Sequence, residues 1–155
     1  MHILIKHIGS NIGISLFLLF SILLGFNAYA EQSAEETIKS RKALFSKNYR
    51  TAKKVQSLSA SGEFDEAKKL MIEMSENYKI LLELFPENSK EGFKTEALPF
   101  IWEDKDNFNT LMQKSSDDLI KLTSAIETTD DISETIRKLM WSNCKACHNK
   151  YREEH

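Results

Sequence analysis

Glycine and proline are scarce in this 155-residue chain, which has only five glycines and two prolines. Both residues interrupt helices, and their scarcity, together with abundant Lys, Glu, Leu and Ala, favours an all-helical protein. No stretch shows the alternation of apolar and polar residues that would predict a strand.

The chain also lacks a strong excess of either charge. Its 21 Lys and Arg residues against 23 Asp and Glu residues give a net charge of −2, and 28% of all residues are charged. This composition suits one soluble domain. Without a basic surplus there is no reason to expect a nucleic-acid partner, and the slight acidity does not select any other partner.

Cysteine is equally scarce, because the chain holds only Cys144 and Cys147. They stand in the run C-K-A-C-H, which ends at His148 and has the spacing of a c-type haem attachment site. Two thiols three positions apart lie on neighbouring points of one helical face, where they can form thioether bonds to both vinyl groups of one porphyrin. The histidine can then place an imidazole nitrogen on the iron. We therefore expect one covalently bound haem c.

Three other kinds of site use paired cysteines, and the sequence fits each of them less well. A structural zinc site needs four ligands and a catalytic one needs three, whereas 31–155 offers two cysteines and two histidines with no second Cys/His cluster. A thioredoxin-like redox pair needs a βαβ pattern, which is not visible. A structural disulfide would have no need of the histidine.

Residues 1–30 have the pattern of a signal peptide that is cleaved. Lys6 supplies the positive start, 12–26 is apolar apart from two serines and two glycines, and Ala28-Tyr29-Ala30 is an A-x-A cleavage site. The alternative is a retained membrane anchor, but the apolar run is short for a membrane span. We expect export to a bacterial periplasm, a mature domain at 31–155 and no membrane association after cleavage. Haem c attachment normally takes place in such a compartment.

Four segments repeat inward-facing residues at alternating steps of three and four, the period of helices in an antiparallel bundle. These positions span 38–59, 64–85, 108–126 and 132–151. Ser33 with Glu36 forms a capping-box signature before the first segment, and Gly62 ends that segment. Asp130 and Asp131 are cap candidates for the last segment. The pattern predicts an all-α, up-down-up-down four-helix bundle with the haem near the C-terminal helix.

The longest connection, 85–103, joins the second and third segments and holds both prolines and an apolar run at 97–102. A loop this long and this apolar is more than a linker. We expect it to fold back over the bundle and wall off a cofactor. For Ile101 and Trp102 two interpretations stay open, a wall of the haem pocket or a plug at the open end of the core.

With these motifs in place, the sequence resembles the cytochrome c′ family, the four-helix-bundle class of c-type cytochromes, over the whole of 31–155. Four features carry the resemblance. The export signal comes first, and the haem motif lies at the C-terminal end. The run A-L-P-F-I-W at 97–102 is similar to the A-x-P-x-I-W segment of the family, and I-K-S-R at 38–41 is similar to its first-helix motif around a haem-contacting arginine.

The resemblance implies a five-coordinate haem iron with His148 on the proximal side. It also implies that an apolar residue of the first helix, here Phe45, closes the distal face. Many family members have a smaller aliphatic residue at that position. The alternative for Phe45 is ordinary core packing, which would also be its role in a haem pocket.

The resemblance further implies that Arg41 pairs with a haem propionate. The alternative is a solvated helix charge, but Arg41 stands within an otherwise apolar stripe, which favours the propionate. Lys42 and Glu96 would line the same edge of the haem, and Arg152 would lie beside His148.

The count of available ligands addresses iron coordination independently of the family. An electron-transfer cytochrome usually has a second axial Met or His. His155 falls two turns after His148 at the end of the same helix and should not reach the opposite haem face. Met71 and Met74 lie on an inward face, where methionine is more often core filler than a ligand. We therefore favour a vacant or apolar sixth position.

The predicted function is a periplasmic haem protein with five-coordinate iron that binds NO and CO and exchanges electrons with a partner protein. The alternative is a low-spin, six-coordinate electron carrier that uses Met71, Met74 or another residue as its sixth ligand. A haem enzyme such as a peroxidase would need a distal His or Arg over the iron, and Phe45 there argues against it. We therefore predict no enzyme and no catalytic residue. A homodimer through the first two helices is typical of the family.

Overall fold

The computed structural model describes residues 33–154, and the signal peptide predicted over 1–30 lies outside them. Within this range the chain is helical, and its long segments match the four that the sequence predicts. The elements are α2 (Ala34–Ala60), α3 (Phe64–Leu82), η1 (Glu87–Ser89), α4 (Phe100–Glu103), α5 (Lys105–Ala125), α6 (Ile132–Ile136), η2 (Arg137–Trp141) and α7 (Ser142–Tyr151). None of the helices in 33–154 is long and apolar enough to cross a membrane.

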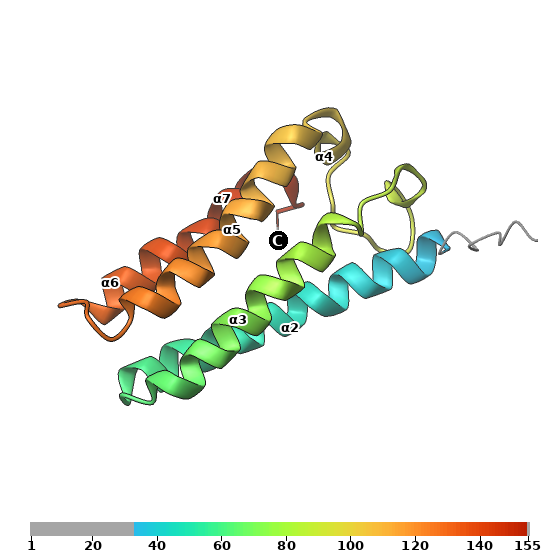
Figure 1. Cartoon of the computed structure of the whole chain (residues 1–155). Helices are drawn as coiled ribbons and strands as arrows, with labels where there is room; N and C mark the ends of the chain where they lie inside the picture. The colour runs from blue at the N-terminus through green and yellow to red at the C-terminus, as the bar shows by residue number, and fades with distance from the viewer. Residues whose placement is uncertain (1–32, 155) are drawn as a thin grey trace, which may run out of the picture. The chain divides into compact units, whose positions relative to one another are not determined.

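The helices form the predicted up-down-up-down bundle. Helices α2 and α3 make one antiparallel pair, and α5 runs antiparallel to the continuous segment of α6, η2 and α7 (Figure 1). The long connection, which carries η1 and α4, joins the two pairs at the end of the bundle where α7 finishes (Figure 1). The chain therefore places the haem motif of α7 beside this connection.

The helix ends follow the signals read from the sequence. The Ser33 hydroxyl accepts a hydrogen bond from the Glu36 amide, and the Glu36 side chain accepts one from the Ser33 amide, which completes the predicted capping box. Gly62 takes a φ of +80° just after α2, a left-handed conformation that glycine adopts without steric cost. Asp131, rather than Asp130, caps α6 by accepting from the Glu134 amide at 2.9 Å.

The predicted stripes form the core. Most of their residues are less than one-tenth exposed, and Met71, Leu81, Leu122 and Ile126 are completely buried. Among the stripe residues that stay half-buried, Phe45 and Cys147 stand apart, because both border the cavity described below. These two positions therefore pack against the core on one side and border the cavity on the other.

Candidate haem site

The haem motif lies on α7, the last helix. Cys144, Cys147 and His148 are all half-buried, and both thiols are free. Because positions 144, 147 and 148 are three and four residues apart, the α-helical period brings them to one face of the helix. That face borders a cavity of about 640 Å³, within the usual size range of cofactor sites.

The structure brings every predicted site residue to this cavity. The contributions come from α2, from the long connection, from α7 and from the residue that follows α7. The predicted residues that line the cavity are Arg41, Lys42, Phe45, Glu96, Cys144, Cys147, His148 and Arg152.

Burial controls the protonation of the two thiols. Burial, with a smaller contribution from the neighbouring Cys144, raises the pKa of Cys147 to about 12. Burial also raises the pKa of Cys144, although the Tyr78 hydroxyl, 3.8 Å from its Sγ, opposes that effect. Both side chains are therefore neutral thiols at neutral pH, which sets them apart from the activated cysteines of catalytic sites.

His148 is held in the form that binds a metal. Burial lowers its pKa, the positive charge of Arg152 lowers it further, and Glu96 acts in the opposite direction. A neutral imidazole keeps a lone pair on one ring nitrogen, and this is the form that coordinates iron.

Arg41 is a buried cation whose hydrogen-bond acceptors are all neutral. It is only 2% exposed. Its guanidinium donates to both the hydroxyl and the carbonyl of Ser89 at 2.9 Å, to Thr95 Oγ1 at 2.6 Å and to the Leu84 carbonyl at 3.3 Å. Its Cζ lies 4.7 Å from the centre of the Phe85 ring. Burial lowers the pKa of Arg41 to about 10.

This arrangement fits an anionic group in the cavity. A buried charge needs compensation, and neutral oxygens and an aromatic ring supply only part of it. A haem propionate would supply the rest, because Arg41 lines the cavity. The paired thiols and the neutral imidazole, which line the same cavity, fit the same group.

The connection between α3 and α5 is tied to α2 at the edge of the cavity. Phe93 and Lys94 take φ values of 49° and 54°, an unusual conformation for non-glycine residues. The Lys94 carbonyl thereby accepts a hydrogen bond from Lys42 Nζ at 2.7 Å. Lys42 Nζ also lies 3.9 Å from a carboxylate oxygen of Glu96, so both predicted edge residues meet there.

The end of the chain closes against the same connection. Helix α7 stops at Tyr151, and Arg152 is extended and forms an antiparallel bridge with Ala97. The expectation that the helix continues for two turns after His148 is therefore wrong, and His155 itself lies outside the described residues. Arg152 Nε is buried and has no hydrogen-bond partner within residues 33–154.

Phe45 lines the cavity and also packs against the edge of the core. Its ring is half-buried and meets the Phe85 ring edge to face, with centroids 6.4 Å apart. The two residues of the apolar run with open interpretations differ in position. Ile101 is 2% exposed, belongs to the buried core and also lines the cavity. Trp102 is half-buried, packs against the core and donates from Nε1 to the Phe85 and Pro86 carbonyls, both at 3.1 Å.

Two further cavity residues were not assigned a role in the haem site from the sequence. Tyr78 comes from α3, and Asn48 comes from α2. Asn48 accepts a hydrogen bond from Asn77 Nδ2 at 2.8 Å, while its own buried Nδ2 has no partner among the described residues. A polar residue at an inward stripe position was the signal that could have identified Asn48. Of the two methionines considered as iron ligands, Met74 lines the cavity and Met71 does not.

Comparison with known proteins gives consistent matches over the described helices. The family model described as Cytochrome C′ matches residues 36–152. A cytochrome c′ of Rhodopseudomonas palustris is 32% identical over 120 residues, which cover 76% of this chain and 82% of that protein.

Two solved structures extend the comparison to the fold. Cytochrome c′ from Rhodopseudomonas palustris has a TM-score of 0.62 at 30% identity and covers 76% of this chain and 96% of its own. The nitric oxide complex of a mutant cytochrome c prime from Alcaligenes xylosoxidans has a TM-score of 0.68 at 19% identity and covers 81% and 99%. At that lower identity, the second likeness shows the fold alone.

Proposed function

Because this chain belongs to the cytochrome c′ family and carries a covalently bound c-type haem, we propose that it is a five-coordinate haem protein that binds small diatomic gases. One observation carries the proposal. Both thiols, the neutral imidazole and the buried Arg41 line a single cavity of a size suited to a cofactor.

Each side chain has a distinct role in this proposal. Cys144 and Cys147 would hold the haem through two thioether bonds, and His148 would bind its iron through a ring nitrogen. Arg41 would pair with a propionate, because its hydrogen-bond acceptors within residues 33–154 are all neutral oxygens. The bound haem supplies the redox-active iron and the open coordination position.

Phe45 is the residue that we assign to the distal side. A phenyl ring has no lone pair to offer the metal, so the iron keeps a vacant sixth position. The same ring takes up space that an incoming gas molecule needs, and we infer that it controls access. The complex of the Alcaligenes xylosoxidans protein with nitric oxide supports NO as the ligand class. This assignment includes CO as a second ligand, and it makes the chain a binding protein rather than an enzyme.

A second candidate function rests on Met74. The thioether sulfur of methionine is an iron ligand in low-spin cytochromes, and Met74 lines the cavity. If it binds the iron, the protein is a six-coordinate electron carrier. An absorption spectrum of the reduced protein decides between the two, because five-coordinate high-spin haem and six-coordinate low-spin haem differ in band shape. A low-spin spectrum for the wild-type protein, together with a high-spin spectrum for Met74→Leu, would replace the first candidate by the second.

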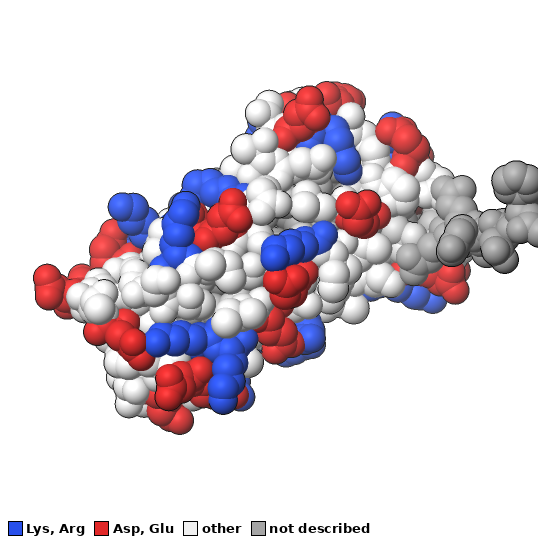
Figure 2. Space-filling view, viewed as in Figure 1, with Lys and Arg blue, Asp and Glu red and all other residues white. Residues whose placement is uncertain are grey.

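The setting of the protein is also part of the proposal. The pattern of 1–30 supports export to the periplasm, where haem c is attached. Lys and Arg side chains alternate with Asp and Glu over the face drawn in Figure 2. If a partner protein exchanges electrons across this face, its binding would therefore not depend on a patch of only positive or only negative charge. Mass spectrometry of the purified protein, before and after acid–acetone extraction, tests both the cleavage site and the thioether attachment.

A further inference from the structure

The last helical segment contains one π-turn, immediately before the haem motif. Residues Arg137–Trp141 form this turn between α6 and α7. The Ser142 amide donates to the Arg137 carbonyl, five residues back instead of four. Such single wide turns are rare inside α-helices and occur frequently at functional sites.

The π-turn sets which residues of α7 face the cavity. A wide turn takes in one more residue than an α-helical turn, so it shifts the phase of the following helix by about 100°. In an uninterrupted α-helix with the same start, Asn143, Ala146 and Cys147 would take the places that Cys144, Cys147 and His148 occupy. The histidine would then turn away from the cavity.

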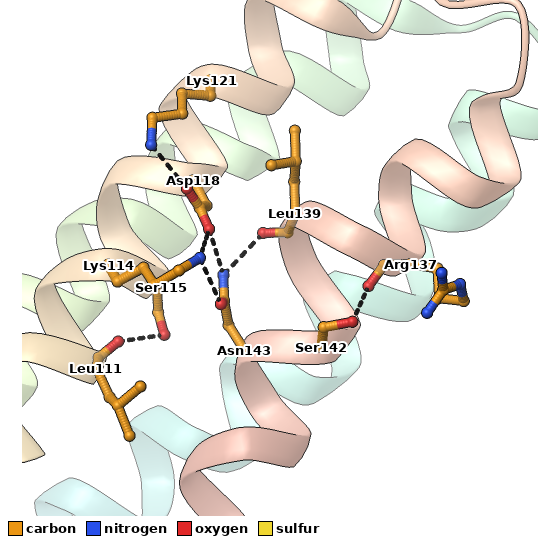
Figure 3. A network of polar contacts seen from close by, with 9 residues as sticks. All are labelled: Leu111, Lys114, Ser115, Asp118, Lys121, Arg137, Leu139, Ser142 and Asn143. Carbon is orange, nitrogen blue, oxygen red and sulfur yellow. Dashed lines mark hydrogen bonds and ion pairs between the residues drawn. The ribbon is translucent and has the colours of Figure 1, made fainter.

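Side chains from the two residues before the motif hold the wide turn. Ser142 Oγ donates to the Arg137 carbonyl at 2.9 Å, and Asn143 Nδ2 donates to the Leu139 carbonyl at 3.1 Å. Figure 3 shows both bonds directed back along the segment. Two carbonyl groups of the turn therefore each receive a side-chain donor.

A buried carboxylate on α5 fixes Asn143 from the neighbouring helix. Asp118 is 2% exposed, and its Oδ2 accepts from Asn143 Nδ2 at 3.0 Å. Lys114 pairs with Asp118 and donates to Asn143 Oδ1 at 3.1 Å, and Lys121 Nζ donates to Asp118 Oδ1 at 2.9 Å (Figure 3). Burial raises the pKa of Asp118, but the hydrogen bonds from Lys114, Asn143 and Lys121 outweigh it and bring the pKa to about 2.

We propose that Asp118 is a positioning residue that acts through Asn143 to hold the π-turn and so to set the rotation of α7. Two lysines stabilise the carboxylate. The carboxylate in turn fixes the side-chain amide of Asn143, the residue directly before Cys144. The inference rests on the proposed assignment of Cys144, Cys147 and His148 to the haem.

The test uses the haem-loaded protein and two variants, Asn143→Leu and Asp118→Ala. Resonance Raman spectroscopy of the ferrous protein measures the frequency of the bond between iron and His148. Hydrogen–deuterium exchange measures the protection of the amides over 139–148. We expect both variants to shift the iron–histidine band and to lose protection in this stretch.

Ser116→Ala is the matched control. Ser116 lies on the same helix and is 2% exposed, but its hydroxyl hydrogen-bonds to Ser75 of α3, at 2.8 Å to the hydroxyl and 3.2 Å to the carbonyl, and not to a residue of the turn. It should lower the melting temperature without moving the band. If Asn143→Leu and Asp118→Ala only lower the melting temperature in the same way, with band and protection unchanged, the inference is overturned.

Asp118→Asn covers the case in which the larger changes yield no folded protein. It keeps the size of the side chain and removes the charge, so a smaller shift in the same direction supports the inference, and no shift overturns it. A wild-type protein without an iron–histidine band would instead contradict the proposed coordination. Exchange over 139–148 would then still decide whether Asp118 holds the turn.

Discussion

Replacement of Arg41 by leucine tests the proposed propionate partner. The change removes one buried positive charge and places an apolar side chain in the inward-facing stripe of α2. An opposite charge within 4–6 Å lowers the pKa of a carboxyl group by about 1–3 units. We therefore expect the propionate pKa to rise by about that amount in Arg41→Leu. The reduction potential should then change with pH over a correspondingly higher pH range.

The same change should also weaken the fold. Arg41 donates to Ser89, to Thr95 and to the Leu84 carbonyl, all in or next to the long connection, so it ties that connection to α2. Hydrogen bonds that involve a charged group contribute about 1.5–3 kcal/mol each, and they are not additive. We expect the free energy of unfolding to fall by about 3–5 kcal/mol, as when a buried charged partner is removed.

Potentiometric titration between about pH 4 and pH 9 measures the effect, with Arg50→Leu as the control. Arg50 lies on the same helix, is exposed and donates to Ser46 Oγ at 2.8 Å. Its loss changes the net charge by the same amount, and Arg50 itself does not line the cavity, although its acceptor Ser46 does. If Arg41→Leu and Arg50→Leu titrate alike, Arg41 only holds the connection in place and has no propionate partner.

Three further predictions concern access, attachment and acid stability. Phe45→Ala should speed CO association to the ferrous protein by about 5–150-fold in flash photolysis, if moving the ring costs about 1–3 kcal/mol; an unchanged rate would remove Phe45 as the gate. Its stability cost should stay below the roughly 3–5 kcal/mol of a fully buried phenylalanine. Replacement of both Cys144 and Cys147 by serine should leave haem that acid–acetone extracts completely, and retained haem would refute thioether attachment. Asp118 has a folded pKa of about 2, so its stabilisation is present above the unfolded pKa near 4 and is lost as the pH falls toward 2. Asp118→Asn should therefore cost about 2 kcal/mol in denaturant titrations at pH 7 and progressively less below pH 4; a constant difference would contradict this.

The helices and the attachment motif were predictable because both depend on local sequence. The inward stripes follow from the helical period, and Ser33 and Asp131 cap through side chains that reach only three residues along the chain. The C-K-A-C-H spacing is read from five consecutive residues. In each of these cases the partners are close in sequence, so propensity and pattern carry the information.

The contacts of Arg41 were not predictable, because they depend on an irregular segment. Its partners Ser89 and Thr95 are 48 and 54 residues away. Two consecutive left-handed residues, Phe93 and Lys94, orient that segment, and neither residue type favours the conformation. The sequence could identify a charge within an apolar stripe, but not the backbone that would meet it.

The π-turn was hidden for a different reason. An apolar stripe about 100° wide can include both Leu139 and Met140. The apolar positions therefore fit an uninterrupted α-helix as well as a helix whose second part is rotated by a π-turn. Only the tertiary contact between Asn143 and Asp118 distinguishes the two. The same holds for Ile101 and Trp102, whose apolar character gave no sign that Ile101 would line the cavity and Trp102 would not.

The central claim is that this chain holds a five-coordinate haem whose open position binds NO. Titration of the ferrous wild-type protein with NO, followed by absorption and resonance Raman spectroscopy, tests it most directly. We predict a high-spin ferrous spectrum that NO converts to a nitrosyl spectrum with one equivalent bound per haem. A low-spin ferrous spectrum that stays unchanged with excess NO would contradict the claim.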